Sequence, residues 1–295
     1  MRLLILILLF PFITHGQIVR THPYYRPTAA ACTPLLLDTY SGAAAAYSLR
    51  QLDCQYAGAL VRVRRSSDNA ESDFYADANG NLDTAALKTF VGTGGTDDGF
   101  VVTWYDQSGN ANNATQSTAG SQSQIMDNGV VIRQNTKPSS YFDGGDFYNI
   151  SNISAADPWS SFCVFKKNAA GSIGMYLSAS ANSPFTPIIY TSVGVYISNS
   201  SGNYKYNVTY NNTNYIILSG FSVGASSYEV YVNGASVSIP SSASEAATAN
   251  FTKMGQRGGG EGSTGYFGEF IIYTSNKTSS RTGIESNINS YYSLY

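Results

Sequence analysis

The chain has 295 residues, a formal net charge of −2 and 12% charged residues. A chain of this length can form one large β domain or two domains of ordinary size. Because neutralising phosphates requires clustered Lys and Arg, the lack of a basic excess argues against a nucleic-acid partner.

The first sixteen residues, MRLLILILLFPFITHG, are predicted to be a secretion signal. Arg2 provides the positive start and residues 3–13 the apolar core, while Thr14 and Gly16 provide the small residues of a cleavage site. The apolar run is shorter than the roughly 20 residues that span a bilayer, and no second run of that length occurs. We therefore expect a secreted or extracellular protein without a membrane span.

Residues 17–31 are expected to form a flexible arm, followed by a single β-sandwich domain over residues 32–295. In an oxidising compartment Cys32 and Cys54 are close enough in sequence to form a disulfide, although other pairings stay open. Cys163 lies in the apolar run SFCVF and is interpreted as a buried thiol.

From Cys32 onward, short apolar or alternating runs are separated by Gly, Asn, Ser and Asp. They include GALVRVRR, GFVVTWYD, NGVVIRQ, SSFCVFKK, TPIIYTS, VGVYISN, NYIILSGF and GEFIIYTS. Their length and their content of Val, Ile, Tyr and Phe predict strands. In VRVRRSSD the arginines alternate like the exposed face of a strand, with an anion site as the alternative. Asn233-Gly234 in YEVYVNGASVSI predicts a type I′ hairpin.

Helical patterns are few. NLDTAALKTFV predicts a short helix, and SSRTGIESNINSYYSLY predicts a better one at the C-terminus. In the second, Thr282 and Glu285 are expected to form a capping box. The apolar face is expected to comprise Ile284, Ile288, Tyr291 and Tyr295. Many short strands and few helices predict an all-β jelly-roll β-sandwich with a short C-terminal helix.

The sequence lacks the residues that several kinds of catalysis and ligand binding require. The two histidines, His15 and His22, lie in the signal and the arm, so a catalytic triad has no base. No phosphate-binding Gly-rich motif is present. DANGNLD places Asp77, Asn79 and Asp83 at spacings seen in calcium loops, but it lacks the required Gly and Glu. We interpret it as a turn, with calcium as the alternative and no other cofactor expected.

Carboxylate chemistry remains open, because glycoside hydrolysis requires two Asp or Glu residues beside the bond. These residues are unevenly placed, since residues 158–228 contain no Asp or Glu. A carboxylate pair must therefore come from the N-terminal part of the domain and the last quarter of the chain.

Three stretches resemble the catalytic domain of glycoside hydrolase family 54, the α-L-arabinofuranosidases. They are AYSLRQLDCQYAGALVRVRRSSDN, VVTWYDQSGNANNATQ and GGEGSTGYFGEFIIYTSNKTSSRTGIESNINSYYSLY. The last also resembles the closing segment of laminin-G-like lectin domains. The resemblance implies a concanavalin A-like β-sandwich and a glycan or polysaccharide partner.

The resemblance also implies where catalytic carboxylates belong. The family's acid is an Asp in the Gly-rich turn before a G-x-F-x-E-G strand, which aligns with residues 265–270 and puts Gly258 at the acid position. Glu261 is the nearest carboxylate, with Asp106 as a further weak catalytic candidate. The family's nucleophile, a Glu, comes from the middle of the domain, which is free of acids here. The catalytic pair is therefore expected not to be kept.

The stretch TWYDQSGNANNATQ has two interpretations. In one, Val101 and Trp104 lie on opposite faces of a strand, and Asp106 and Ser108 cap the turn that follows. In the other, Trp104 or Tyr105 stacks on a sugar ring while Asp106 accepts hydrogen bonds from its hydroxyls. The turn is favoured. The candidate carbohydrate-binding residues are Trp104, Tyr105, Asp106, Asp143, Asp146 and Glu261.

The sequence thus predicts a secreted, non-catalytic jelly-roll protein that binds glycans in adhesion or forms part of an extracellular or virion surface. Two alternatives are an arabinofuranosidase-like glycoside hydrolase and a structural subunit of a filament or virion. The last would self-assemble or bind other surface proteins through an exposed sheet edge.

Overall fold

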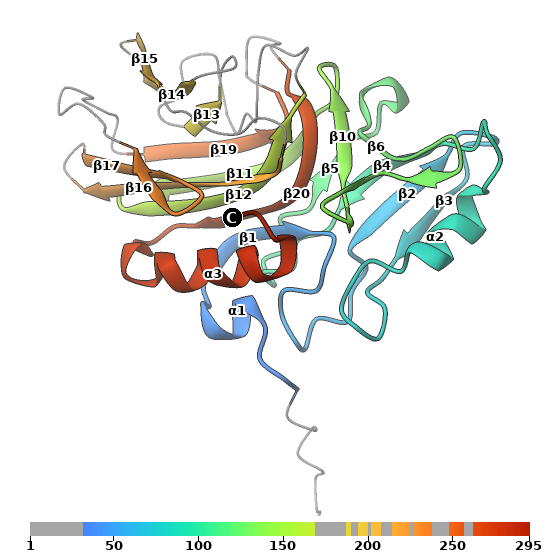
Figure 1. Ribbon diagram of the computed structural model, residues 1–295, viewed down its shortest axis with the longest axis horizontal. Helices are drawn as coiled ribbons and strands as arrows, with labels where there is room; N and C mark the ends of the chain where they lie inside the picture. The colour runs from blue at the N-terminus through green and yellow to red at the C-terminus, as the bar shows by residue number, and fades with distance from the viewer. Residues whose placement is uncertain are drawn as a thin grey trace, which may run out of the picture. The chain divides into compact units, whose positions relative to one another are not determined.

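An antiparallel β-sheet dominates the computed structural model of the chain (Figure 1). The structure describes residues 32–168, 187–189, 194–199, 202–207, 214–224, 227–237, 248–256 and 262–295. The predicted signal, the predicted arm and Glu261 lie outside these ranges. Thr33–Tyr295 form one compact unit.

Most of the strands are short, as the spacing of turn residues predicts. Up to the middle of the chain they are β1 (Ala43–Ser48), β2 (Val61–Arg65), β3 (Glu71–Phe74), β4 (Gly99–Trp104), β5 (Ala114–Thr115), β6 (Gln124–Asp127), β7 (Val130–Val131), β8 (Arg133–Gln134), β9 (Lys137–Pro138), β10 (Ser140–Asp143), β11 (Tyr148–Ala156) and β12 (Trp159–Lys167). Further on they are β13 (Pro187–Ile189), β14 (Gly194–Asn199), β15 (Gly202–Asn207), β16 (Ile216–Gly224), β17 (Ser227–Val232), β18 (Ala235–Val237), β19 (Thr248–Met254) and β20 (Thr264–Tyr273). Strands β11, β12, β16 and β20 are longer, with nine or ten residues.

The described helices are α1 (Leu36–Thr39), α2 (Thr84–Val91) and α3 (Arg281–Tyr292), with the 3-10 turns η1 (Ala119–Ser121) and η2 (Thr278–Ser280). The short helix predicted in NLDTAALKTFV is α2, which begins after Asp83. The Asp83 carboxylate caps it by accepting from the backbone N–H groups of Ala85 and Ala86. No helix in the described ranges combines the length and apolar character needed to cross a membrane.

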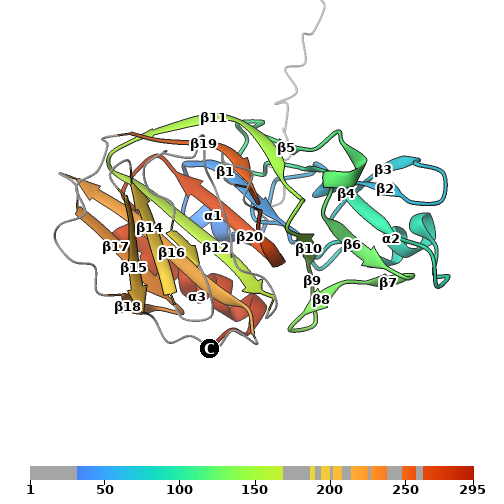
Figure 2. The same cartoon turned by 90° about the horizontal axis from the view of Figure 1, so that it is seen from above.

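The main sheet follows the order β18-β17-β16-β12-β20-β10-β6-β4-β5-β11-β19, with β1 paired to β20 and β2 paired to both β3 and β4. Its pairings are antiparallel, and Figure 2 shows β10 between the β12–β16–β17 half and the β4–β6 half. The sheet is curled, and the predicted all-β jelly-roll sandwich is confirmed. Strand β3 lies at an edge, paired in this sheet with β2.

Two hydrophobic clusters explain why residues 162–165 of β12 are apolar without interruption. Cys163 and Phe165 point into the cluster inside the sandwich. Phe162 and Val164 point the other way, into a second cluster with residues of α1 and α3. Helix α3 lies along this outer face (Figure 1). A strand covered on both faces therefore carries apolar side chains at successive positions.

The C-terminal helix is confirmed, but its predicted cap is wrong. Ser280 is the N-cap residue and its side chain makes no capping bond. Glu285 does not bond back to the helix start, because its buried carboxylate accepts from Ser219 Oγ at 2.7 Å and pairs with Arg281. A tertiary contact has replaced the local one.

The buried face of α3 differs from the prediction at two positions, because Tyr291 is only partly buried and Tyr295 is exposed. Ile284, Ile288 and Tyr292 are buried, at a constant spacing of four residues. Tyr295 is 58% exposed and lies beyond the helix. The predicted hairpin is confirmed: Asn233 and Gly234 both have positive φ, as a type I′ turn requires.

Candidate functional site

Asp106 is a structural residue of the turn after β4. It is 5% exposed. Its Oδ1 accepts from the backbone N–H groups of Ala46 and Ser108, at 2.8 and 2.9 Å. Its Oδ2 accepts from Ser108 Oγ and from the N–H of Asn112, at 2.8 and 3.0 Å. Both oxygens are used, so the turn interpretation replaces the weak catalytic and sugar-binding roles of Asp106.

Trp104 offers no ring face to a ligand, because it is 1% exposed. The expectation that Val101 and Trp104 point to opposite faces is wrong, since both are buried in the same hydrophobic cluster inside the sandwich. The register between β2 and β4 shifts between Arg62 and Val63, which inserts Val102 and turns Trp104 inward. The sugar-stacking role of Trp104 is therefore corrected to a core role.

Tyr105 remains half-buried at the surface. Its hydroxyl donates to Asp73 Oδ1 at 2.8 Å. Burial and this hydrogen bond raise the pKa of Tyr105 to about 12. Asp73 also receives a bidentate contact from Arg62, at 2.8 and 2.9 Å, and the pKa of Asp73 is lowered because of Arg62. Asp73 is thus a fixed, ionised carboxylate.

Residues 143–146, here the acidic turn, bring two candidate residues together between β10 and β11. Asp143 is exposed and Asp146 is 6% exposed. The N–H of Asp143 donates to Asp146 Oδ2 at 2.9 Å, and Asp143 Oδ1 accepts from the N–H of Gly145 at 2.7 Å. One carboxyl group thus faces water while the other is enclosed.

The acidic turn packs against the segment that leads into β20. Asp143 pairs with Thr264, and a Cβ added to Gly262 would lie 1.8 Å from the carbonyl oxygen of Gly144. Only glycine allows this approach. Glu261, the other candidate carboxylate, precedes Gly262 in sequence and lies outside the described residues.

Burial raises the pKa of Asp146 to about 7, against the opposing effect of the N–H of Asp143. The nearby Asp143 carboxylate raises this pKa further. Asp146 therefore keeps a proton close to neutral pH, beside an exposed carboxyl group. A buried acid with a raised pKa is the kind of group that transfers protons in active sites.

A groove of about 580 Å³ runs beside β3 and α2. It is lined by Arg65, Ser72, Asp73, Phe74, Tyr75, Asp83, Ala86, Thr89 and Phe90. Tyr75 is 51% exposed, and the fixed carboxylate of Asp73 lies two residues before it in sequence. A cavity of this size with an aromatic ring and a few fixed polar groups suits a small ligand. We call it the Tyr75 groove.

Sequence reasoning missed Tyr75. With 23 tyrosines in a β-rich chain, no single tyrosine stands out. Its exposure depends on β3 being an edge strand, which local pattern does not reveal.

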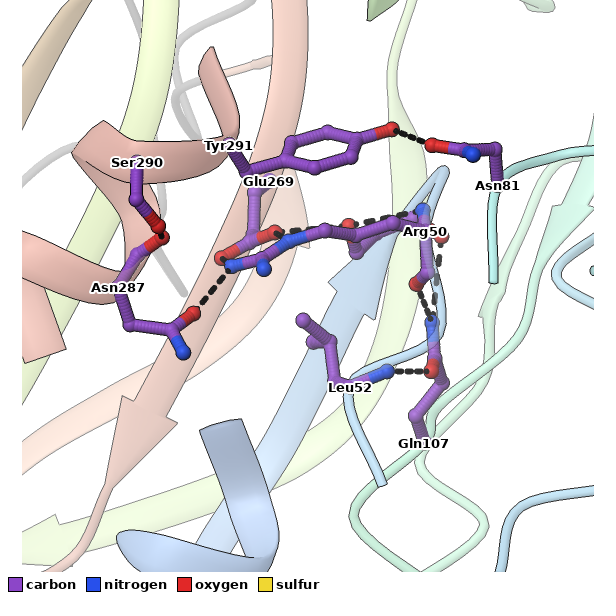
Figure 3. A network of polar contacts seen from close by, with 9 residues as sticks. Arg50, Leu52, Asn81, Gln107, Glu269, Asn287, Ser290 and Tyr291 are labelled. Atoms are coloured by element: carbon purple, nitrogen blue, oxygen red, sulfur yellow. Dashed lines mark hydrogen bonds and ion pairs between the residues drawn. The ribbon is translucent and has the colours of Figure 1, made fainter. Parts of the chain in front are cut away.

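A buried polar network links β1, β20 and α3 (Figure 3). Arg50 pairs with Glu269 and donates to Asn287 Oδ1 at 3.0 Å. Ser48 Oγ donates to Glu269 Oε2 at 2.8 Å. Because the Glu269 side chain is 1% exposed and bonded to these groups, its role is structural.

The residues proposed for calcium make the contacts of a turn and a helix cap. Asp77 Oδ1 accepts from the N–H groups of Asn79 and Asn81, at 2.8 and 2.9 Å. Asp83 caps α2. Calcium binding stays a prediction. Cys32 and Cys54 are disulfide-bonded, and Cys163 is a buried thiol, as predicted.

Comparison with known proteins places these features in context. Residues 37–151 match the family described as "Alpha-L-arabinofuranosidase B, catalytic". No curated protein matches significantly. An arabinofuranosidase complexed with arabinofuranosyl-α-1,2-xylobiose overlays with a TM-score of 0.64 at 17% identity. A family 54 α-L-arabinofuranosidase soaked with a cyclic sulfate inhibitor gives 0.65 at 17% identity.

Both overlays cover 86% of this chain and 64% of the other protein, so the chain spans just under two thirds of those proteins' length. The chain is therefore similar to family 54 arabinofuranosidases in sequence over residues 37–151 and in fold over most of its length. The resemblance stated from the sequence is confirmed.

Proposed function

We propose that the protein recognises glycans that carry arabinofuranosyl groups. The observation that carries this proposal is the match of residues 37–151 to the arabinofuranosidase catalytic family. The overlays with arabinofuranosidases support the same fold for the rest of the chain. The predicted secretion signal would bring the protein to extracellular glycans, where a role in adhesion or at a surface stays our proposal.

Binding is assigned to the Tyr75 groove. Sugar rings present C–H patches that stack on aromatic faces, and hydroxyls that bond to carboxylates. Tyr75 offers an exposed ring, and Asp73 offers a carboxylate held in place by Arg62 and Tyr105. Because these acceptor atoms are already ordered, binding costs little side-chain entropy.

The test is calorimetric titration of the chain with arabinoxylan and arabinan oligosaccharides. We expect Tyr75→Ala to weaken binding by about tenfold, corresponding to about 1.4 kcal/mol for a lost stacking contact. Tyr295→Ala is the matched control, because Tyr295 is 58% exposed and lies at the C-terminus. No binding by the wild-type chain, or equal loss in both variants, would overturn the proposal.

Hydrolysis of arabinofuranosides is a second candidate function, favoured by Asp146. A carboxyl group that keeps its proton near neutral pH is suited to protonate a leaving sugar oxygen. A retaining mechanism needs a second carboxyl group about 5–5.5 Å away. Asp143 is not proposed as this second carboxyl group, because it interacts directly with Asp146 and raises the pKa of Asp146.

Release of 4-nitrophenol from 4-nitrophenyl α-L-arabinofuranoside tests this candidate. If the chain is a hydrolase, Asp146→Asn lowers the rate of arabinose release from arabinoxylan oligosaccharides by about 100-fold or more, because Asn has no proton for the leaving sugar oxygen. The same variant loses much less activity on the 4-nitrophenyl substrate, because 4-nitrophenolate leaves without being protonated. Tyr75→Ala leaves the rate on this small substrate unchanged. Binding without any release by the wild-type chain supports recognition alone.

A further inference from the structure

A second cavity, of about 270 Å³, lies between the turn that precedes α2 and the β8–β9 hairpin. It is lined by Asp77, Asn81, Leu82, Thr84, Arg133, Thr136, Lys137 and Pro138. Nearly all of these side chains are polar or charged. We call it the Arg133 pocket. Its volume suits one small ligand.

The two cations of the pocket have no carboxylate partner in the described part of the chain. Arg133 donates through Nη1 to the carbonyl of Thr136 at 2.8 Å and through Nη2 to Thr84 Oγ1 at 3.2 Å. These bonds fix its guanidinium across the pocket. The Lys137 ammonium lies 4.1 Å from the ring centroid of Tyr291. Neither cation forms an ion pair with a described residue, so the pocket has an uncompensated positive charge.

Asp77 supplies one opposing charge and a hydrogen-bond acceptor. Its Oδ1 is used by the N–H groups of Asn79 and Asn81, and its Oδ2 has no hydrogen-bond donor among the described residues. An anion without hydroxyl groups, such as acetate, would be repelled by Asp77 and could donate no hydrogen bond to it. A ligand with both a carboxylate and hydroxyl groups satisfies the two cations and the free oxygen together.

The pocket is held in shape by the C-terminal helix. The Tyr291 hydroxyl donates to Asn81 Oδ1 at 2.9 Å (Figure 3). Asn135, in the β8–β9 hairpin, donates to the carbonyls of Tyr292 and Ser293, at 3.1 Å each. Both walls of the pocket are thus bonded to the C-terminal segment, so its charged groups are ordered before a ligand arrives.

We propose that the Arg133 pocket binds the carboxylate of a uronic acid residue in an acidic glycan. Arg133 and Lys137 hold the carboxylate, and Asp77 accepts from a ring hydroxyl. The choice of a sugar acid rests on the proposed glycan recognition, whereas the preference for a carboxylate rests on the pocket alone.

The experiment titrates the full chain with D-galacturonate and D-glucuronate, and with D-galactose, acetate and inorganic phosphate as matched probes. Binding is followed by NMR shifts at two salt concentrations. We expect uronate binding that weakens with added salt, and much weaker binding of galactose, acetate and phosphate. Lys137→Gln should weaken uronate binding by about three- to tenfold.

Lys277→Gln is the matched control, because the Lys277 ammonium also lies over a tyrosine ring, 4.8 Å from that of Tyr273. It should leave uronate binding unchanged. Arg133→Gln should act like Lys137→Gln, although it also removes contacts of the hairpin. The inference is overturned if galactose binds as well as galacturonate, if phosphate or acetate binds as tightly, or if both lysine variants behave alike.

Binding of neutral arabinofuranosyl oligosaccharides is measured in parallel. Neutral binding without a uronate preference overturns this inference and leaves the proposed function standing. A uronate preference lost in Lys137→Gln, without neutral binding, supports this inference and overturns the proposed function.

Discussion

Arg50 and Glu269 form a bidentate ion pair inside the protein. Arg50 Nε lies 2.8 Å from Glu269 Oε2, and Arg50 Nη2 lies 3.0 Å from Oε1. The pair joins the segment after β1 to strand β20, and the Arg50 guanidinium lies 4.7 Å from the ring centroid of Tyr291. Tyr291 in turn bonds to Asn81 in the Arg133 pocket. Tyr291 therefore contacts both the buried ion pair and a residue of the Arg133 pocket.

Breaking this pair should strongly destabilise the fold. Arg50→Met leaves the Glu269 carboxylate buried with Ser48 as its remaining side-chain donor, so we expect a loss of about 3–5 kcal/mol in the free energy of unfolding. The double variant Arg50→Met/Glu269→Leu should lose less than Arg50→Met alone, because no buried charge is left over. Urea unfolding measures both. A loss no larger than that of the exposed-pair control Arg65→Ala would contradict the prediction.

Trp104 should matter for stability and not for glycan contact. Trp104→Ala opens a large cavity in the core and should cost about 3–5 kcal/mol. Trp104→Phe keeps much of the apolar volume and removes Nε1, a buried donor without a partner in the described part of the chain. We expect Trp104→Phe to bind arabinofuranosyl oligosaccharides within about twofold of the wild type. A much larger loss in a folded Trp104→Phe variant would restore the stacking role.

Gly262 should be intolerant of any side chain. A Cβ at this position would lie 1.8 Å from the Gly144 carbonyl oxygen, so Gly262→Ala must displace the acidic turn. Because the enclosure of Asp146 depends on that packing, the pKa of its carboxyl group should fall from about 7 toward the ordinary value of 3.8. Carboxyl chemical shifts followed through a pH titration measure this change. Gly120→Ala, with open space around its Cβ, is the control and should leave the titration unchanged.

The strands, the hairpin at Asn233-Gly234 and the C-terminal helix were predictable because their signals are local. Turn residues, β-branched residues and a four-residue repeat act within about ten positions of each other. Asp143 and Asp146 were predicted as candidate residues, and their contact is also local, since one four-residue turn brings them together.

Other features depend on residues far apart in sequence. The inward position of Trp104 follows from a register shift against β2, which alternation along β4 cannot indicate. The Arg133 pocket needs α3 to deliver Tyr291 beside Lys137. Glu285 of α3 accepts a hydrogen bond from Ser219 of β16, far away in sequence, and does not form the local cap. In each case the observed arrangement depends on a tertiary contact, which the local sequence does not reveal.

Asp146 should make the protein less stable as pH rises. Its pKa is raised by burial to about 7 in the folded chain, against 3.8 as its ordinary value. Between about pH 4 and 7 the folded state therefore holds a proton that the unfolded state has lost. The free energy of unfolding should fall through this window, by up to about 4 kcal/mol from this residue, and then level off.

Asp146→Asn isolates the effect, because Asn mimics the protonated acid and its Oδ1 can still accept from the N–H of Asp143. We expect the variant to match the wild type near pH 4 and to exceed its stability above pH 7. The pKa of Glu285 is also raised by burial, and its contribution cancels in the difference between the two proteins. Asp127→Asn, at an exposed position, should keep the wild-type slope. Urea unfolding at pH 4, 5.5, 7 and 8 measures the difference, and parallel slopes for wild type and Asp146→Asn would mean that the pKa of Asp146 is the same in the folded and unfolded chains.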